Sequence, residues 1–366
     1  MQIKDILSEI ERFAPLPYQE SYDNCGVQVG DITMSATGAL FSLDVTEAVL
    51  DEAIARNCNL VIAHHPLIFS GLKSITGRNY VERVILKAIR HDIVIYAAHT
   101  NLDNVQSGVN RKIAEKLGLK NAKILAPVKK SLYKLYTYVP ATGAGQLKAA
   151  LFAAGIGTIG EYSECSFETG GTGTFRPSER SNPVIGIAGG SREEVPELKL
   201  EFIVPEHLKA KAVKVLKENH PYEEVAYELI ALENENQTIG AGMIGQLETP
   251  MRAGDFLRYL KERMQTACIR HTALHKEEIS TVAVCGGAGS FLLKNAMAAG
   301  ADIFITGDYK YHQFFDAENR IIIADIGHYE SEQFTIEIFS EILKEKFPNF
   351  ALLFTKTNTN PVNYYF

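Results

Sequence analysis

The sequence predicts an α/β protein in which a discontinuous α/β domain carries an inserted ferredoxin-like α+β domain. Short apolar strands alternate with amphipathic helices in residues 1–125 and again in residues 236–366, a pattern typical of α/β folds. Residues 126–235 instead contain a duplicated strand–helix–strand pattern. A chain of 366 residues is long enough for two or three domains. We therefore expect the first and last segments to fold together as one domain, with the middle segment inserted.

The first segment begins with an amphipathic helix and continues as a βαβ unit. The helix has apolar residues at helical spacing, namely Ile3, Ile6, Leu7, Ile10 and Phe13. Strands are predicted at residues 39–45 and 59–63, on either side of a helix that Thr46 caps. A further helix at residues 80–90 leads to a strand at residues 93–98. The last two of these strands run into polar residues, where open α/β sheets bind ligands.

The middle segment contains an internal repeat. Residues 135–167 and 200–232 both have the pattern of strand, helix and strand, and a Val-Pro pair precedes the helix in each copy. A duplicated βαβ unit predicts a ferredoxin-like sandwich. Between the copies, the Gly-rich and Ser-rich residues 169–192 predict a hairpin or a mobile loop.

The alternation of strands and helices returns in the last segment. Strands are predicted at residues 280–287, 301–308 and 320–326. Helices are predicted up to Ala299, around Tyr311 and from His328 to Lys346. Each predicted strand is therefore followed by a helix, as in the first segment.

Composition and charge exclude several classes of protein. Hydrophobic residues make up 46% and charged residues 22% of the chain, which is ordinary for a globular protein. A net charge of −7, without long runs of Lys or Arg, argues against a nucleic-acid surface. The acidic first helix does not resemble a signal peptide, and no apolar run approaches the ~20 residues that span a bilayer. Five scattered cysteines without a CxxC pair argue against a disulfide framework, so we expect a cytoplasmic protein.

Two adjacent histidines, His64 and His65, follow the predicted strand at residues 59–63. Pro66 disfavours a helical conformation at His65, so the chain leaves the strand extended or turned. Because neighbouring side chains of extended backbone point in opposite directions, the two imidazoles are better placed to bind two different ions than one. The alternative is a polar strand end with two solvated or hydrogen-bonded histidines.

The next strand is followed by His99 and Asp103, which lie four residues apart. Asp103 is a candidate metal ligand because it lies just beyond a strand end, as the two histidines do. His99 is a candidate partner of a ligand or a proton shuttle. A hydrogen bond in the core explains His99 equally well.

The third candidate pair, His328 and Glu332, follows the strand at residues 320–326. Residues four apart on a helix share one face, so an imidazole and a carboxylate can converge there. Taken alone, such a pair is more often a surface ion pair. Together with the residues at the two other strand ends, it predicts a site of three histidines and two carboxylates: His64, His65, Asp103, His328 and Glu332.

This set of nitrogen and oxygen ligands suits zinc, iron or manganese. Five ligands exceed what one tetrahedral zinc needs, which favours two divalent ions about 3.5 to 4 Å apart. We assign His64 and Asp103 to one ion and His65 and His328 to the other, with Glu332 as the bridge.

Other polar residues have weaker claims to a role in the site. Asp308 and His312 also follow a strand and could orient the ligands, although Asp308 could simply cap a helix. The glycine turn at residues 285–290 could bind phosphate, but it lacks the lysine of a P-loop, and tight packing explains it better. Three further histidines, His220, His271 and His275, are expected on the surface.

Several motifs together resemble the GTP cyclohydrolase I type 2-like family, also called the NGG-interacting-factor-like family. These motifs are DNCGVQVGD, AHHPLIF, HTNLD, CGGAGS, TGD and DIGHYESE, and they cover both outer segments. The resemblance implies that His64, His65, Asp103, His328 and Glu332 bind two divalent metal ions per subunit. It also implies a PII-like or CutA-like inserted domain, assembly as a toroidal homohexamer, and opening of the imidazole ring of GTP.

The leading functional hypothesis is a metal-dependent hydrolase that acts on a nucleotide or a related phosphorylated metabolite, with Glu332 and His99 as catalytic residues. The rival hypothesis is a metal-binding scaffold or metallochaperone whose inserted domain senses a metabolite and which has no turnover of its own. In either case the expected partners are a small molecule and further copies of the chain, and not a membrane or a nucleic acid.

Overall fold

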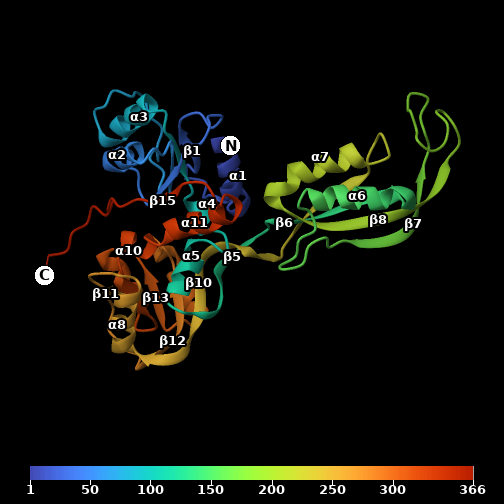
Figure 1. Ribbon diagram of the computed structural model, residues 1–366. Coiled ribbons are helices and arrows are strands. Elements are labelled where there is room, and N and C mark those ends of the chain that lie inside the picture. Colours follow the sequence, from blue (N-terminus) through green and yellow to red (C-terminus); the bar gives the residue numbers. More distant parts are fainter. Residues whose placement is uncertain (366) are drawn as a thin grey trace. The chain divides into compact units, whose positions relative to one another are not determined.

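The computed structural model describes residues 1–365 and divides the chain into two compact units. Unit 1 contains residues 1–127 and 237–366, and unit 2 contains residues 128–236. Figure 1 shows both units. The architecture is a mixed α/β fold with three sheets.

The first sheet of unit 1 has a parallel core. Its strand order is β1 (Gly26–Val29), β4 (Val94–Ala97), β3 (Leu60–Ala63), β2 (Ala39–Ser42) and β15 (Leu352–Phe354). All neighbours are parallel except β1, which is antiparallel to β4. Every residue of β2, β3 and β4 is buried, as expected for strands covered on both faces. The carboxyl ends of these three strands therefore lie together at one edge of the sheet.

The helices around this sheet largely confirm the sequence predictions. They are α1 (Ile3–Phe13), α2 (Glu47–Ala55), α3 (Tyr80–Arg90), α4 (Thr100–Asp103) and α5 (Val109–Lys116), with a 3₁₀ turn at Leu16–Tyr18. Thr46 caps α2 by accepting a hydrogen bond from the N–H of Val49. The short helix α4 begins directly after His99 and carries Asp103 in its single turn.

The second sheet contains the strands of the last segment. Its order is β11 (Arg270–His271), β14 (Ile322–Asp325), β13 (Ile303–Thr306), β12 (Glu278–Val284), β10 (Glu235–Arg252) and β5 (Lys120–Lys129). Strands β12, β13 and β14 are parallel. The associated helices are α8 (Ala253–Arg263), α9 (Leu293–Ala298), α10 (His328–Glu332) and α11 (Thr335–Lys346), with 3₁₀ turns at Ser290–Leu292 and Tyr311–Ala317.

Two details of the last segment differ from the sequence predictions. The predicted continuous helix from His328 to Lys346 is wrong, because the chain forms two helices, α10 and α11, separated at Gln333 and Phe334. The predicted helix around Tyr311 is a 3₁₀ helix. Because the chain breaks after Glu332, α10 can direct His328 and Glu332 toward the site while α11 packs in the core.

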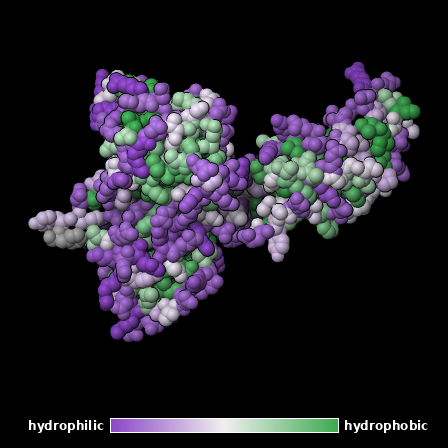
Figure 2. All heavy atoms as spheres, in the orientation of Figure 1, coloured by the Kyte–Doolittle hydropathy of each residue, from purple (hydrophilic) through white to green (hydrophobic). Residues whose placement is uncertain are grey.

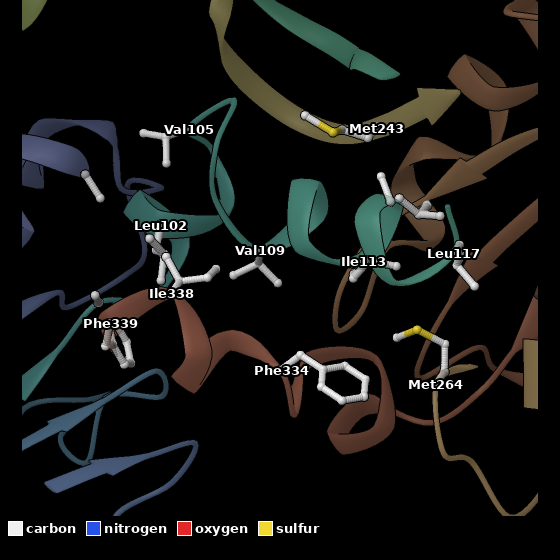
Figure 3. Close-up of a cluster of buried hydrophobic side chains, with 14 of the residues drawn as sticks. Leu102, Val105, Val109, Ile113, Leu117, Met243, Met264, Phe334, Ile338 and Phe339 are labelled. Carbon is white, nitrogen blue, oxygen red and sulfur yellow. The ribbon is translucent and has the colours of Figure 1, made fainter. Parts of the chain in front are cut away.

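The two sheets of unit 1 exchange strands and share one core. Strand β15 from the end of the chain pairs with β2, whereas β5 from the first segment joins the second sheet. The shared core contains Leu102, Val109 and Ile113 from the first segment and Met243, Met264, Phe334, Ile338 and Phe339 from the last (Figure 3). This interlocking brings residues that are about 260 positions apart into one site, as the 267 positions between His65 and Glu332 show.

Unit 2 has the β-α-β-β-α-β order that the sequence predicts. Its elements are β6 (Leu132–Pro140), α6 (Ala141–Ala153), β7 (Phe167–Phe175), β8 (Glu193–Pro205), α7 (Lys209–Asn219) and β9 (Tyr227–Leu232), with a 3₁₀ turn at Glu206–Leu208. The antiparallel sheet has the order β7-β8-β6-β9. Figure 1 shows α6 and α7 on one face of this sheet, where they enclose a buried core.

The structure of unit 2 corrects two predictions. The strand predicted at residues 156–167 is wrong, because Gly157 and Gly160, with φ of 82° and 57°, turn the chain there. The strand begins only at Phe167 and uses part of the Gly-rich segment, so residues 176–192 connect a hairpin of β7 and β8. His220, predicted on the surface, is 8% exposed, and its Nε2 lies 3.0 Å from the carbonyl oxygen of Tyr138.

The surface of unit 1 agrees with the amphipathic character of its helices. Hydrophilic residues cover much of its visible face, with smaller hydrophobic patches between them (Figure 2). Within residues 1–365, none of the helices combines the length and the apolar character needed to cross a bilayer.

Candidate metal centre

His64 and His65 extend the pairing of strand β3 by two residues. The N–H of His64 donates to the carbonyl of Ser42 at 3.2 Å, and that of His65 donates to the carbonyl of Leu43 at 2.9 Å. The backbone therefore stays extended beyond the strand. The two ring centroids are 4.9 Å apart, so the imidazoles lie close together and the expectation that they point in opposite directions is wrong. Their Nε2 atoms nevertheless face different oxygens of Glu332.

His64 takes part in a group of three buried acceptors. Its Nδ1 lies 2.8 Å from the carbonyl oxygen of Ala98, and a carbonyl can only accept, so Nδ1 carries the hydrogen and Nε2 presents a lone pair. That Nε2 lies 3.6 Å from Oδ1 of Asp103 and 3.7 Å from Oε1 of Glu332. Nε2 of His64 and Oδ1 of Asp103 are buried and have no hydrogen-bond partner among residues 1–365. Buried acceptors that face one another are costly unless a cation lies between them.

His65 and His328 form a second group with the other oxygen of Glu332. The two Nε2 atoms are 3.3 Å apart, and Oε2 of Glu332 lies 3.0 Å from that of His65 and 3.1 Å from that of His328. Two nitrogen ligands of a tetrahedral zinc, each bound at about 2.0 to 2.1 Å, are separated by about 3.3 Å. Carboxylates fix both rings, since Asp44 lies 2.8 Å from Nδ1 of His65 and Asp308 lies 2.7 Å from Nδ1 of His328.

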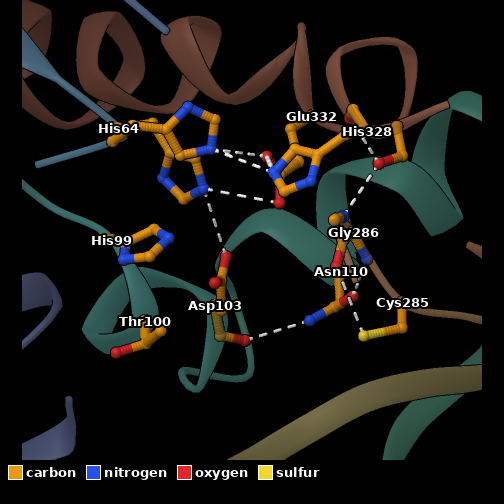
Figure 4. A network of polar contacts seen from close by, with 12 residues as sticks. His64, His99, Thr100, Asp103, Asn110, Cys285, Gly286, His328 and Glu332 are labelled. Carbon is orange, nitrogen blue, oxygen red and sulfur yellow. Dashed lines mark hydrogen bonds and ion pairs between the residues drawn. The ribbon is translucent and has the colours of Figure 1, made fainter. Parts of the chain in front are cut away.

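Glu332 lies between the two groups and directs one oxygen toward each (Figure 4). Its side chain is 3% exposed. The glycine turn makes room for it, because a Cβ on Gly287 would lie 2.5 Å from Oε1 of Glu332 and a Cβ on Gly286 would lie 3.2 Å from its Cγ. Gly287 also has a φ of 61°, which favours glycine. The turn therefore allows the carboxylate to reach both groups.

The backbone N–H groups of this glycine turn are already hydrogen-bonded. Gly286 donates to Oδ1 of Asn110 at 3.0 Å, Gly287 donates to Oγ of Ser331 at 2.9 Å, and Gly289 donates to Oγ1 of Thr306 at 2.9 Å. Tight packing, and not phosphate binding, accounts for the CGGAGS motif. Asn110 also donates to the backbone carbonyl of Asp103 at 3.1 Å, which connects the turn with α4.

The electrostatics around His65 and His328 favour positive charge where their Nε2 atoms converge. Burial alone lowers the pKa of a histidine. Hydrogen bonds to Asp44 and Glu332 outweigh burial and raise the pKa of His65 to about 10. Glu332 and Asp308 likewise raise the pKa of His328 to about 9.

The other group contains a neutral imidazole and two unlike carboxyl groups. Burial lowers the pKa of His64, so its imidazole stays uncharged. Burial and the nearby Glu332 carboxylate raise the pKa of Asp103 well above its ordinary value. Burial opposes the charge on Glu332 too, but the surrounding imidazoles of His64, His328 and His65 hold its pKa well below its ordinary value. A divalent cation would stabilise both carboxylates in their charged form.

His99 lies beside the cluster and is oriented by Asp23. Its Nδ1 lies 2.9 Å from Oδ1 of Asp23, and its ring centroid is 5.2 Å from that of His64 and 5.4 Å from that of His65. Asp23 also accepts hydrogen bonds from the hydroxyl and the N–H of Thr100. These bonds outweigh burial and lower the pKa of Asp23. A charged Asp23 keeps the hydrogen on Nδ1, which leaves Nε2 of His99 free to exchange a proton.

Comparison with known proteins identifies the family. A sequence profile for Duf34/NIF3 (NGG1p interacting factor 3) matches residues 1–361. The chain belongs to the DUF34/NIF3 family. A relative from Halalkalibacterium halodurans, called GTP cyclohydrolase 1 type 2 homolog, is 41% identical over 364 residues, which are 98% of each chain. A Bacillus subtilis relative of the same name is 36% identical over 367 residues, 99% of this chain and 98% of that one.

Solved structures agree with this membership. The crystal structure of a Bacillus cereus protein related to NIF3 is 37% identical, with a TM-score of 0.86, and the match covers 100% of this chain and 99% of that one. A Staphylococcus aureus protein of known structure is 32% identical, with a TM-score of 0.80 and the same coverage. The mixed α/β fold with several sheets is therefore the fold of this family.

In this DUF34/NIF3 protein the cluster opens into a cavity of about 600 Å³. Its walls include His99, Asp103, His328 and Glu332, together with the more exposed Glu20, Tyr22, Phe69 and Phe291. The rings of Tyr22 and Phe69 are 6.4 Å apart between centroids. No Lys or Arg is among the described residues that line this cavity. An anionic ligand would therefore find positive charge only at the cluster.

The structure brings all five predicted ligands, and His99, to this one cavity or its wall, but not every other predicted residue. Asp308 contacts His328, as suggested, whereas His312 lies outside and stacks on Phe315 at a centroid distance of 6.5 Å. Sequence reasoning missed Asp44 and Asp23. Asp44 follows β2 as His64 follows β3, so its position at a strand end was a usable indication. Asp23 lies in an irregular loop, where its place at the start of the DNCGVQVGD motif was the available indication.

Proposed function

We propose that this protein is a metal-dependent hydrolase that uses two divalent ions, zinc, iron or manganese, to cleave a nucleotide or a related phosphorylated metabolite. The observation that carries the proposal is a set of polar atoms that face one another in the buried cluster: Nε2 of His64 and Oδ1 of Asp103, which have no hydrogen-bond partner among the described residues, and Oε1 of Glu332, which lies 3.7 Å from that Nε2. Nitrogen and oxygen donors without thiolates suit these metals. The name of the bacterial relatives supports a nucleotide as substrate.

The ligand assignment follows the two groups of atoms. His64 and Asp103 would hold one ion and His65 and His328 the other, with Glu332 offering one oxygen to each. When bound, such an ion pair supplies Lewis acidity and lowers the pKa of water. Asp44 and Asp308 keep the hydrogen on Nδ1 of His65 and His328, so that each Nε2 lone pair faces the centre.

His99 is the proposed proton-transfer residue. A ring nitrogen of His99 lies within 4.8 Å of ring nitrogens of His64 and His65, at the wall of the cavity. Because Asp23 holds Nδ1, Nε2 can accept a proton from the attacking group or return one to the leaving group. The catalytic residues are therefore Glu332, which orders the centre, and His99.

The lining of the cavity favours one orientation of the substrate. A phosphate group would find positive charge only at the cluster, whereas a planar base would contact Tyr22, Phe69 and Phe291. Opening of a guanine ring would require the reverse orientation, with the base at the cluster and the triphosphate near Glu20. No basic side chain among the described lining residues would bind the triphosphate there. Cleavage of a phosphate ester therefore fits this cavity better than the reaction named in its relatives.

The test combines elemental analysis with a Glu332→Gln variant. We expect the purified protein to contain two divalent ions per chain and to hydrolyse at least one nucleotide or phosphoester, and the variant to lose an ion and its turnover. Glu330→Gln is the matched control, because Glu330 is a buried glutamate of the same helix that hydrogen-bonds to Asn360 and not to the cluster. Turnover by Glu332→Gln with both ions retained would refute the bridging role.

The rival proposal is a metal-binding scaffold or metallochaperone with a metabolite-sensing insert, PII-like or CutA-like. It would gain if metal-replete protein bound two ions yet turned over none of the nucleotides and phosphoesters tested.

Under either proposal we expect a cytoplasmic location and assembly as a homohexamer. Light scattering of the purified protein would test the assembly, since a mass of six chains is expected.

A further inference from the structure

Unit 2 contains a cavity of about 710 Å³ that is separate from the metal centre. Helices α6 and α7 cover one face of its sheet, and the cavity lies on the other face. Its floor includes Tyr138, Glu197 and the stretch from Thr169 to Phe175 of β7. Residues 176–185 of the hairpin connection and residues 222–226 form its sides.

Two of the three glycines of β7, Gly170 and Gly171, are not required by the packing of unit 2. Gly170 and Gly171 have ordinary φ values, and no described atom lies within 4 Å of where a Cβ would stand on either of them. Gly173 differs, because a Cβ there would lie 2.0 Å from Oε2 of Glu197. Glycine weakens a strand, and in a strand interior it often marks a site where a ligand or another backbone comes close. A flat ligand on the cavity face of β7 would account for Gly171.

A fixed carboxylate lies opposite this glycine. Glu197 is the partner of Gly171 in the pairing of β7 with β8, so the two share one face of the sheet. The hydroxyl of Tyr222 donates to Oε1 of Glu197 at 2.7 Å. Oε2 of Glu197 has no hydrogen bond in the part of the chain that the structure describes, so it remains able to accept.

Aromatic and charged side chains complete the cavity. Besides Arg176, its lining includes Lys199, which pairs with Glu201, and the acidic Glu223 and Glu224. The rings of Phe175 and Tyr222 are 6.1 Å apart between centroids, and the N–H of Tyr222 donates to Nδ1 of His220 at 3.1 Å, which fixes the tyrosine. Arg176 lines the cavity and makes neither a hydrogen bond nor an ion pair with any described residue. Its guanidinium is therefore available to an anionic group.

We propose that this cavity binds a planar heteroaromatic metabolite that has adjacent N–H donors and an anionic group, as in a guanine nucleoside monophosphate. The ring lies on the backbone of β7 at Gly171, beside Phe175 and Tyr222. Two N–H groups on one edge of the ring donate to Glu197, and the anionic group pairs with Arg176. This site requires no metal ion.

Calorimetric titration of the full-length, metal-loaded protein tests the proposal, with guanosine monophosphate and adenosine monophosphate as probes. We expect a site for the guanine nucleotide that does not depend on the metal centre, and binding of the adenine nucleotide at that site weaker by about tenfold or more, because its ring lacks the paired donors. Gly171→Val and Glu197→Gln should each weaken the guanine nucleotide by a similar factor. Guanosine, which lacks the phosphate, should bind more weakly than the monophosphate in the wild type but not in Arg176→Ala.

Two controls separate this cavity from the metal centre and from unfolding. Gly170→Val adds the same side chain to the opposite face, where the neighbour is Leu198, and should bind normally. Glu332→Gln should bind normally as well. Valine favours strands, so Gly171→Val should keep or raise the melting temperature. Loss of binding in Glu332→Gln with retention in Gly171→Val and Glu197→Gln would overturn the proposal, as would a change of oligomeric mass in Gly171→Val without a change in binding.

Discussion

The metal centre of unit 1 and the cavity of unit 2 are recognised by opposite features, an excess of polar atoms in the first and the absence of a side chain in the second. In the metal centre, polar atoms of His64, Asp103 and Glu332 face one another, and those of His64 and Asp103 have no hydrogen-bond partner among the described residues. In the cavity, the side chain is missing at Gly171 although the space for it is open. An ion is held by lone pairs, so its site contains unsatisfied acceptors. A planar molecule needs a flat surface, so its site contains glycines.

This contrast has consequences for stability. Groups that converge on a cation repel one another without it, so the metal centre should be stable only when loaded. The cavity contains no such conflict, because its carboxylate is hydrogen-bonded and its glycines are unstrained. Changes at the metal centre should therefore reduce stability and function together, whereas changes in the cavity should weaken binding without a loss of stability.

The largest effect is expected from removal of the ions with a chelator. When free metal is present at about a thousand times its Kd, its removal should lower the free energy of unfolding of unit 1 by about 4 kcal/mol. Hydrogen exchange would locate the effect. Amides of residues 60–65 and 328–332 should lose protection, whereas those of β6 should not. Equal loss of protection in both units would contradict the contrast.

A smaller effect is expected from Gly287→Ala. The added Cβ would lie 2.5 Å from Oε1 of Glu332, at a φ of 61°. We expect a loss of about 1 to 3 kcal/mol in the free energy of unfolding, together with loss of at least one ion in elemental analysis. Gly300→Ala is the matched control, since Gly300 has a φ of 76° but open space for a Cβ. If Gly300→Ala also lost an ion, general destabilisation, and not the contact with Glu332, would explain the ion loss of Gly287→Ala.

Local spacing was enough to predict most elements of unit 1. The helix predicted at residues 80–90 coincides with α3, and Thr46 caps α2 as expected. These elements depend on apolar periodicity and on a capping side chain, which lie within a few residues of each other. The break between α10 and α11 and the late start of β7 were not predictable in this way. The first depends on packing against the rest of unit 1, and the second depends on pairing with β8.

The site was predictable in part, because several of its residues lie just beyond strands that local sequence patterns identify. His64 and Asp103 follow neighbouring parallel strands, β3 and β4, which brings them to one edge of the first sheet. His328 follows β14 of the second sheet and meets them because the two sheets share one core. Their proximity agrees with the predicted set, while their role as metal ligands stays a prediction that elemental analysis will test. Asp23 was missed because only the tertiary fold brings its loop to His99, 76 positions away. The cavity of unit 2 gave no indication beyond a glycine-rich segment.

Acid should weaken unit 1 through a carboxylate that is remote from both sites. Glu52 of α2 accepts hydrogen bonds from Thr355, Lys356 and Thr357, which outweigh burial and lower its pKa to about 2. A pKa lowered in the folded state contributes stability above the unfolded value, near 4.5, and that stability is lost as the pH falls toward 2.

The Glu52 contribution should be about 1 kcal/mol after solvent screening. Denaturant titrations between pH 7 and pH 3 would measure it, and Glu52→Gln should flatten the acid dependence. Glu47→Gln on the same helix is the control, because Glu47 is exposed and pairs only with Arg83 across the surface. An unchanged pH profile in Glu52→Gln would show that the C-terminal segment is held by other contacts.

The smallest effect, and the one with the opposite sign, is expected from Gly171→Ala. An alanine here meets no atom within 4 Å and needs no unusual φ. It restricts the unfolded chain more than the folded one, so the free energy of unfolding should rise by about 0.4 to 1 kcal/mol. Thermal unfolding would show this as a small increase in Tm, against the decrease for Gly287→Ala. If Gly171→Ala lowered the Tm instead, glycine would be required by the fold of β7 itself, and its presence would no longer point to a ligand.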